Sequence, residues 1–324
     1  MRTSDPSERP TYTAEQMTKY YDCISLPSKY RHELGSKSRE AATGKDALSF
    51  LAALQKYQLA SVPFENLELH YSPRHVINIE PEYLFHKIVE RGTGRGGYCM
   101  ENNCLFGTVL RSLGFDLYSA GARVSGSMQP QAEPKYTGWS HMINIVTIQS
   151  QRYFVDVGFG SSGPTHPIPL VHDRVSVNVP PQTVRLNHTN ILDNTSRDSD
   201  KLLWVYEHRN ADDAPWTPTY CFTETEFLPA DFTVMSHHTS TSKTSWFTYK
   251  VICTKMLMDP GTEQIVGDVT LFETAIKKRI AGKAEALTTI TSEEERIRAL
   301  EEHLGVKLSE AERTGIQGMV SEVK

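Results

Sequence analysis

The spacing of the hydrophobic residues changes once along the chain, and this change limits what the sequence can fold into. Before the change, Leu48, Leu51 and Leu54 recur every three residues after the acidic Asp46, a pattern that predicts a helix. After about Leu117, the apolar segments become short, rich in β-branched and aromatic residues, and bounded by turn-forming residues, which is typical of strands. Helices followed by strands and a mixed C-terminal part indicate an α+β protein with more than one domain.

Local signals place further elements. A cap-like segment at 13–16 predicts the start of a first helix, and helical spacing continues over 81–91. Near the C-terminus, Ser292 and Glu295 form a capping-box pattern ahead of an amphipathic helix, and Gly305 is placed to end it. We expect strands at four segments: 142–148, 153–157, 202–206 and 246–252.

Composition narrows the classes of protein. The 324 residues exceed the roughly 150 of a typical single domain, so we expect two or three domains. The 34 Lys and Arg residues are scattered among 39 Asp and Glu residues, which argues against a nucleic-acid partner. No apolar run reaches the about 18 residues of a membrane span, and the first ten residues lack the apolar part of a signal peptide. We therefore expect a cytoplasmic protein without a membrane partner.

The five cysteines are widely scattered and contain no C-x-x-C pair. This arrangement favours neither a disulfide framework nor a metal site, so no metal is expected. It is typical of a protein that works in a reducing compartment.

The segment at 91–103, RGTGRGGYCMENN, is the densest unusual stretch. Gly92, Gly94 and Gly97 match the spacing of a dinucleotide-binding turn, but that turn must follow a strand, and the segment before it is predicted to be helical. Its glycines instead allow the backbone to bend tightly just before Cys99. If Cys99 starts a helix, the helix dipole favours the thiolate form, whereas the alternative is a buried structural cysteine.

A nucleophilic cysteine needs a base and a group that orients the base. His141 stands at the head of the apolar run 142–146, where a strand end can present its ring to a cleft. Asp156 interrupts an apolar strand, and an unpaired carboxylate would be costly to bury there. The 15 residues from His141 to Asp156 are enough for two antiparallel strands and a short turn, so the two side chains can pair.

Taken together, four motifs resemble those of the arylamine N-acetyltransferases. They occur in the family's order with comparable spacing: VPFENL at 62–67, RGGYCMExN at 95–103, His141, and DVGFG at 156–160. The tail at 300–306 is also similar, so the resemblance covers about residues 12 to 310. It implies an N-terminal helical bundle, a central β-barrel and a C-terminal α/β lid around a cysteine-protease-like Cys-His-Asp core. The expected domains are 1–112, 113–222 and 223–324.

The resemblance also implies a reaction. Cys99 would be the nucleophile, His141 the base and Asp156 the group that orients it. Acyl-CoA is the implied co-substrate, with acetyl-CoA, propionyl-CoA or malonyl-CoA as candidate donors. The acyl group would pass through a cysteine thioester to small arylamines, hydrazines or arylhydroxylamines in a ping-pong reaction.

Other residues are assigned to the site by the same resemblance. Positions implied to contact CoA are Thr137, Gly138, Ser242 and Thr244. Positions implied to contact the acceptor substrate are Phe159 and Tyr98. Arg95 is expected to form a structural ion pair with Glu65, and the alternative is a catalytic role.

Alternatives remain open at this stage. The same order of Cys, His and Asp occurs in cysteine hydrolases, such as amidases and transglutaminase-like enzymes. A binding module that kept only the fold would predict a broken triad, whereas all three residues are present. Two polar stretches, 125–135 and 187–201, have the composition of surface loops and lie where they could shape the rim of the site.

Overall fold

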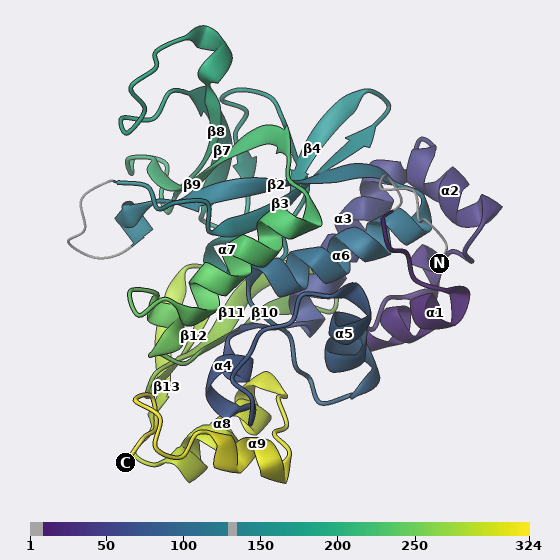
Figure 1. Cartoon of the computed structure of the whole chain (residues 1–324). Coiled ribbons are helices and arrows are strands. Elements are labelled where there is room, and N and C mark those ends of the chain that lie inside the picture. The colour runs from purple at the N-terminus through teal and green to yellow at the C-terminus, as the bar shows by residue number, and fades with distance from the viewer. Residues whose placement is uncertain (1–8, 129–134) are drawn as a thin grey trace.

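Helices dominate the first third of the protein, and two β-sheets make up much of the rest (Figure 1). The computed structural model describes residues 9–128 and 135–324. Among the described residues, six helices precede the larger sheet: α1 (Ala14–Cys23), α2 (Ser36–Thr43), α3 (Ala47–Ser61), α4 (Leu67–Tyr71), α5 (Pro81–Phe85) and α6 (Cys99–Leu113). Three follow later in the chain: α7 (Pro229–Thr241), α8 (Glu293–Leu304) and α9 (Glu310–Gly315).

The larger sheet has eight strands in the order β5-β4-β3-β2-β9-β8-β7-β6, all paired antiparallel. Their bounds are β2 (Asp116–Val124), β3 (His141–Ile148), β4 (Gln151–Val155), β5 (Ile168–Pro169), β6 (Ser176–Val177), β7 (Thr183–Thr189), β8 (Leu203–Arg209) and β9 (Thr217–Glu226). The sheet is curled, but its end strands β5 and β6 have two residues each and, within the described residues, do not pair with each other. The expected β-barrel is therefore present as an open, curled sheet.

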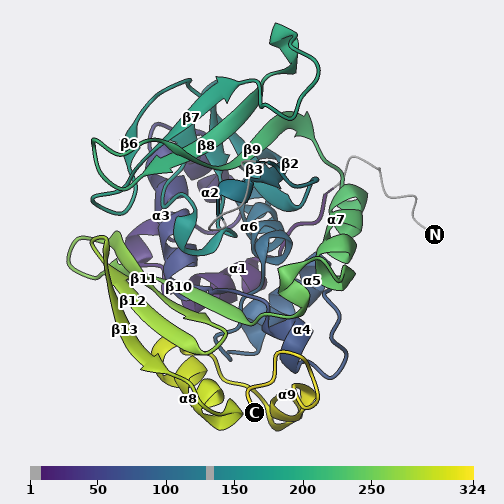
Figure 2. The ribbon, with the colours of Figure 1, turned by 90° about the vertical axis from the view of Figure 1, so that its left-hand side faces the viewer.

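The smaller sheet combines distant parts of the chain. Its order is β1 (Phe64–Glu65), β10 (Ile252–Asp259), β11 (Gln264–Phe272), β12 (Ala275–Ile280) and β13 (Lys283–Thr289). Figure 2 shows this sheet below the larger one, with α8 and α9 at the bottom of the molecule. Because β1 comes from the N-terminal third, this sheet joins that third to the C-terminal part of the chain by backbone hydrogen bonds.

Most predicted helices are present. Thr13 caps α1 in a capping box with Gln16, and helical structure covers 81–90, although its second half, His86–Glu90, is a π-helix. Ser292 accepts a hydrogen bond from the backbone of Glu295 at the start of α8. Gly305 ends that helix in the left-handed conformation.

Two predicted boundaries are wrong. The segment 246–252 was expected to be a strand, but Trp246–Thr248 is a short 3-10 turn and β10 begins only at Ile252. Its aromatic residues pack as a stacked pair with ring centroids 3.9 Å apart, and the Thr248 amide donates to the Ser245 carbonyl, so the backbone turns here. The expected loop at 187–201 starts later, because residues 187–189 continue β7. In the other predicted loop, residues 129–134 lie outside the described residues.

The central helix α6 passes beneath the larger sheet, with α7 alongside it (Figures 1 and 2). Leu105, Phe106 and Val109 of α6 are fully buried and belong to the main hydrophobic core. Val146 of β3 and Val155 of the neighbouring strand β4 belong to the same core. Burial of one whole face fixes the rotation of α6, and with it the direction in which the residues at its N-terminus point.

A buried group of six ionisable side chains lies at the N-terminal end of α6. This ionic cluster consists of Glu65, Glu68, Lys87, Arg95, Glu101 and Glu312. The Arg95 guanidinium donates to Glu65 at 2.9 Å, as predicted, and also to Glu312 at 2.5 Å and Glu68 at 3.3 Å. Glu312 belongs to α9, so the cluster joins the glycine-rich turn to the C-terminal part of the chain.

We predict that Arg95→Gln lowers the free energy of unfolding by about 3–5 kcal/mol, because it leaves buried carboxylates without their cation. Arg152→Gln is the matched control: Arg152 pairs with Glu224 on the surface, so its loss should cost less than about 1 kcal/mol. Urea denaturation of both variants measures the difference. Equal stability of the two variants would contradict a structural role for the cluster.

Candidate active site

Cys99 is the first residue of α6 and follows the glycine-rich turn. An added Cβ at Gly96 would lie 1.9 Å from the backbone oxygen of Pro63, so only glycine fits where the turn packs against the segment before β1. At the helix start, the Glu101 carboxylate accepts a hydrogen bond from the Tyr98 amide at 3.1 Å. These contacts hold Cys99 at the positive end of the α6 dipole, with only 4% of the residue exposed.

His141 and Asp156 meet because β3 and β4 are antiparallel neighbours. His141 is the first residue of β3, and Asp156 follows directly after the last residue of β4. His141 Nε2 lies 2.7 Å from Asp156 Oδ2, and both side chains are almost fully buried. The pairing predicted from their separation in sequence is therefore present.

The Asp156 carboxylate receives three further hydrogen bonds. The donors are the Asn103 amide at 2.8 Å, the Tyr220 hydroxyl at 2.7 Å and the Gly158 backbone amide at 2.7 Å. Burial alone would raise the pKa of Asp156, but His141 and these donors hold it below its usual value. Asp156 is therefore ionised in a site that excludes water.

Sequence reasoning assigned no role to two of these donors. Asn103 stands four residues after Cys99, and this helical spacing, which places both side chains on one face of α6, was a usable signal. Tyr220 lies on β9 and gives no local signal, because only the curling of the sheet brings it to Asp156.

Gly158 lets the chain after β4 pass close to Cys99. An added Cβ there would lie 2.7 Å from Cys99 Cα and 2.7 Å from Asn103 Nδ2. The close approach explains why a glycine follows Asp156 and Val157, and it brings the Asp156 turn into direct contact with the start of α6.

His141 is charged in this arrangement. Burial alone would lower its pKa, but the charge and hydrogen bond of Asp156, together with a hydrogen bond to Cys99, raise the pKa of His141 to about 10. Since Nε2 faces Asp156, Nδ1 is the nitrogen left for Cys99. The imidazole of His141 therefore lies between the Cys99 sulfur and the Asp156 carboxylate, and these three side chains form the Cys-His-Asp array.

Apolar side chains cover the other side of Cys99. This Cys99 cluster consists of the buried residues Tyr98, Met100, Met142, Phe232 and Met235, with the partly buried Phe64, Ile77, Ile79, Cys104, Trp139, Phe227 and Phe247 packed around them. Phe232 and Met235 come from α7, so this helix closes the site from outside. On the His141 side, the Phe159 ring meets the imidazole edge-to-face at 4.9 Å.

The remaining predicted contact residues lie at different depths. Thr137 and Gly138 are exposed in the segment that leads into His141, and Thr244 is exposed in the connection from α7 to β10, which also carries Ser242. Tyr98 is completely buried, and its hydroxyl hydrogen-bonds the Ser236 hydroxyl at 2.5 Å. Tyr98 therefore ties the start of α6 to α7, and its predicted contact with substrate stays a prediction.

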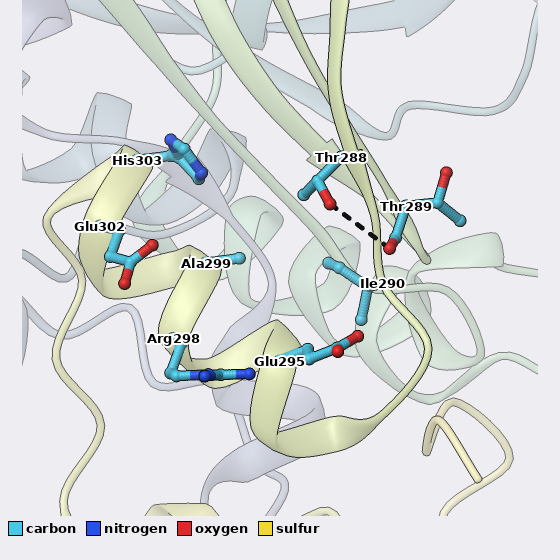
Figure 3. Close-up of a pocket in the computed structure, with 8 residues that line it drawn as sticks. All are labelled: Thr288, Thr289, Ile290, Glu295, Arg298, Ala299, Glu302 and His303. Atoms are coloured by element: carbon cyan, nitrogen blue, oxygen red, sulfur yellow. Dashed lines mark hydrogen bonds between the residues drawn. The ribbon is translucent and has the colours of Figure 1, made fainter.

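Two hollows lie outside the Cys-His-Asp array. One, of about 210 Å³, is a charged depression between β13 and α8, where Glu295, Arg298 and Glu302 project from the helix (Figure 3). The other, of about 140 Å³, lies between α6 and α7. Met142 and Phe232 line the second hollow and also belong to the Cys99 cluster, so this hollow adjoins the cluster.

Residues 9–128 and 135–324 contain no group of three or more His, Cys, Asp and Glu side chains that could hold a metal ion. In the same part of the chain, no helix has the length and apolar character needed to cross a membrane.

Comparison with known proteins shows what this chain is similar to. A sequence model of a family described as N-acetyltransferase matches residues 47–313. The N-malonyltransferase FDB2 of Fusarium pseudograminearum is 40% identical over 320 residues, 95% of this chain and 93% of that protein. Arylamine N-acetyltransferase 1 of Homo sapiens is 30% identical over 243 residues, 74% of this chain and 80% of that protein.

Solved structures share the fold. The arylamine N-acetyltransferase of Mycobacterium marinum in complex with CoA matches with a TM-score of 0.74 at 23% identity, over 95% of this chain and 99% of that one. The enzyme from Mycobacterium abscessus matches with a TM-score of 0.76 at 21% identity, over 97% and 99%. The α+β fold with its curled sheet is thus common to all three.

We predict that Asp156→Asn lowers the pKa of His141 below its ordinary 6.5, because burial then acts without the opposing carboxylate. In the unaltered protein, the raised pKa stabilises the fold fully below about pH 6.5, and this contribution is lost as the pH rises through about 10. Nitrogen-15 NMR of the imidazole ring measures the titration.

Asp173→Asn is the control, because Asp173 is an exposed carboxylate that pairs with Arg185 and should leave the pKa of His141 unchanged. An Asp156→Asn protein whose His141 still titrates near pH 10 would contradict the assigned pairing.

Proposed function

The chain belongs to the arylamine N-acetyltransferase family and is therefore an acyltransferase, and we propose that it moves a short acyl group from acyl-CoA to small aromatic amines through a thioester on Cys99. The observation that carries this proposal is the buried array in which His141 contacts both Cys99 and an Asp156 carboxylate held by four donors. Such an array suits nucleophilic acyl transfer because it supplies a nucleophile, a proton carrier and a fixed orientation for that carrier.

In the first half-reaction, the sulfur of Cys99, whose proton the His141 imidazolium carries, attacks the acyl carbon of acyl-CoA. The bond from the acyl carbon to the Cys99 sulfur forms, and the bond from that carbon to the CoA sulfur breaks. The departing CoA thiolate takes the proton from the His141 imidazolium. One thioester replaces another, so the acyl group stays reactive toward nitrogen.

In the second half-reaction, the amine attacks the acyl-cysteine. The C–N bond forms, the C–S bond breaks, and His141 accepts the proton that the nitrogen releases. Acylation prepares His141 for this task, because the interactions with the Cys99 thiol that help raise the pKa of His141 are lost once the sulfur is acylated. Asp156 keeps the ring oriented throughout.

The remaining predicted residues fit this scheme as contacts. Phe159 presents its ring beside His141, where an aromatic amine would approach, and we assign it to the acceptor. Thr137, Gly138 and Thr244 are exposed and Ser242 is half-buried, and all four are assigned to CoA. Acetyl, propionyl and malonyl groups are the candidate acyl groups, and the relative at 40% identity that is named an N-malonyltransferase supports malonyl.

We predict that brief incubation with acetyl-CoA, propionyl-CoA or malonyl-CoA adds one acyl group to Cys99, and that an arylamine then removes it. Intact mass spectrometry and peptide mapping follow both steps. Cys99→Ala should abolish the adduct. Cys104→Ala should leave it unchanged, since the Cys104 thiol lies further along α6 and contacts the Ile79 carbonyl instead.

Two outcomes would count against the proposal. If no donor acylates the protein, the cysteine thioester is wrong. If water discharges the adduct as fast as an arylamine does, the protein is a cysteine hydrolase of the alternative class.

A further inference from the structure

Among the described residues, Arg123 is a cation without a carboxylate partner beside the Cys99 cluster. Its guanidinium lies over the Trp139 ring, 4.1 Å from the ring centre, and makes one hydrogen bond of 3.3 Å to the Thr137 carbonyl. No carboxylate of the described residues forms an ion pair with it. By contrast, Lys87 and Arg95 of the ionic cluster each form ion pairs with buried carboxylates.

The register of the larger sheet places Arg123 on the side that faces α6 and α7. Ala122 pairs with His141 and Gly121 with Met142, so side chains at 121 and 123 point to the face on which Met142 packs against Cys99. Phe227 lies against Gly121 and meets the Trp139 ring at 5.4 Å, which extends the apolar wall of the Cys99 cluster to Arg123.

The segment under Arg123 leads directly to the nucleophile. Trp139 precedes Ser140, whose backbone oxygen lies 3.7 Å from Cys99 Sγ. Stacking on Trp139 holds the flat guanidinium by its face and leaves the edge, with most of its N–H donors, free. A planar fork of donors at the edge of the Cys99 cluster is suited to bind a carboxylate with two hydrogen bonds.

We propose that Arg123, held by Trp139, binds the free carboxylate of a dicarboxylic acyl donor, so that malonyl-CoA is preferred over acetyl-CoA. This inference rests on the proposed function, because it concerns the group carried by the Cys99 thioester. A malonyl group differs from an acetyl group by one carboxylate, and burying that charge beside Cys99 requires a cation that no other carboxylate neutralises. Arg123 is a specificity residue and takes no part in the transfer of the acyl group or the proton.

The test measures the first half-reaction alone, by rapid quench and intact mass, without an acceptor. Arg123→Met is expected to lower the second-order rate of Cys99 malonylation by about 10- to 100-fold, the usual range for losing a charge-assisted hydrogen bond. Acetylation should change by less than about threefold, since acetyl lacks the carboxylate. Arg123→Lys keeps the charge but not the fork and should lie between.

The matched control is Arg209→Met, which removes another arginine stacked on a tryptophan, Trp216, elsewhere in the same sheet. It should leave both rates unchanged. Acetylation of Cys99 in Arg123→Met also reports that the variant is folded. If Arg123→Met fails to fold, the ratio of the malonylation rate to the acetylation rate in Arg123→Lys tests the inference instead.

Each other outcome overturns the inference. An equal loss for both donors means that Arg123 acts on CoA or on the fold, and no loss for either means that it does not contact the donor. An unaltered protein that accepts acetyl-CoA but not malonyl-CoA rejects the inference and keeps the proposed function. An unaltered protein that forms no adduct rejects the proposed function itself. Because no acceptor is present, a carboxylate on the acceptor cannot produce the expected result.

Discussion

The Asp156 carboxylate is the group on which the arrangement of the site depends. It is buried, and a buried carboxylate is stable only when donors replace the water it has lost. Its donors come from His141 on β3, Asn103 on α6, Tyr220 on β9 and the turn after β4. Satisfying this one charge therefore fixes the relative positions of the central helix and three strands of the curled sheet.

The ionic cluster stabilises the N-terminal end of α6 in a comparable way. It contains two cations and four carboxylates, so the charges do not balance by pairing alone. Burial, together with nearby Glu65, raises the pKa of Glu101 to about 7 against the opposing effect of Lys87, so Glu101 is partly protonated near neutral pH. The same carboxylate binds the Tyr98 amide, and the cluster thereby supports the turn that presents Cys99.

Cys99 lies between a polar side and an apolar side. His141 and Asp156 place a hydrogen-bonded pair of charged side chains on one side, whereas the apolar Met142, Phe232 and Met235 cover the other. A thioester held in such a place is shielded from hydrolysis, and this suits transfer to an amine better than transfer to water. Arg123 and Trp139 stand at the edge of the apolar side, where a charged acyl group would need a partner.

Local sequence determined much of this protein. The capping residues of α1 and α8, the helical spacing of α3 and the bend before Cys99 depend on near neighbours, and the separation of His141 from Asp156 matches one hairpin. Only the tertiary structure decided the rest. Tyr220 reaches Asp156, and Glu312 reaches Arg95, across long stretches of chain, because burial of a charge selects partners by position in space and leaves no periodic pattern in the sequence. The short end strands β5 and β6 likewise leave the sheet open. The aromatic residues at 246–247 prefer strands but form a turn, because their packing overrides this preference.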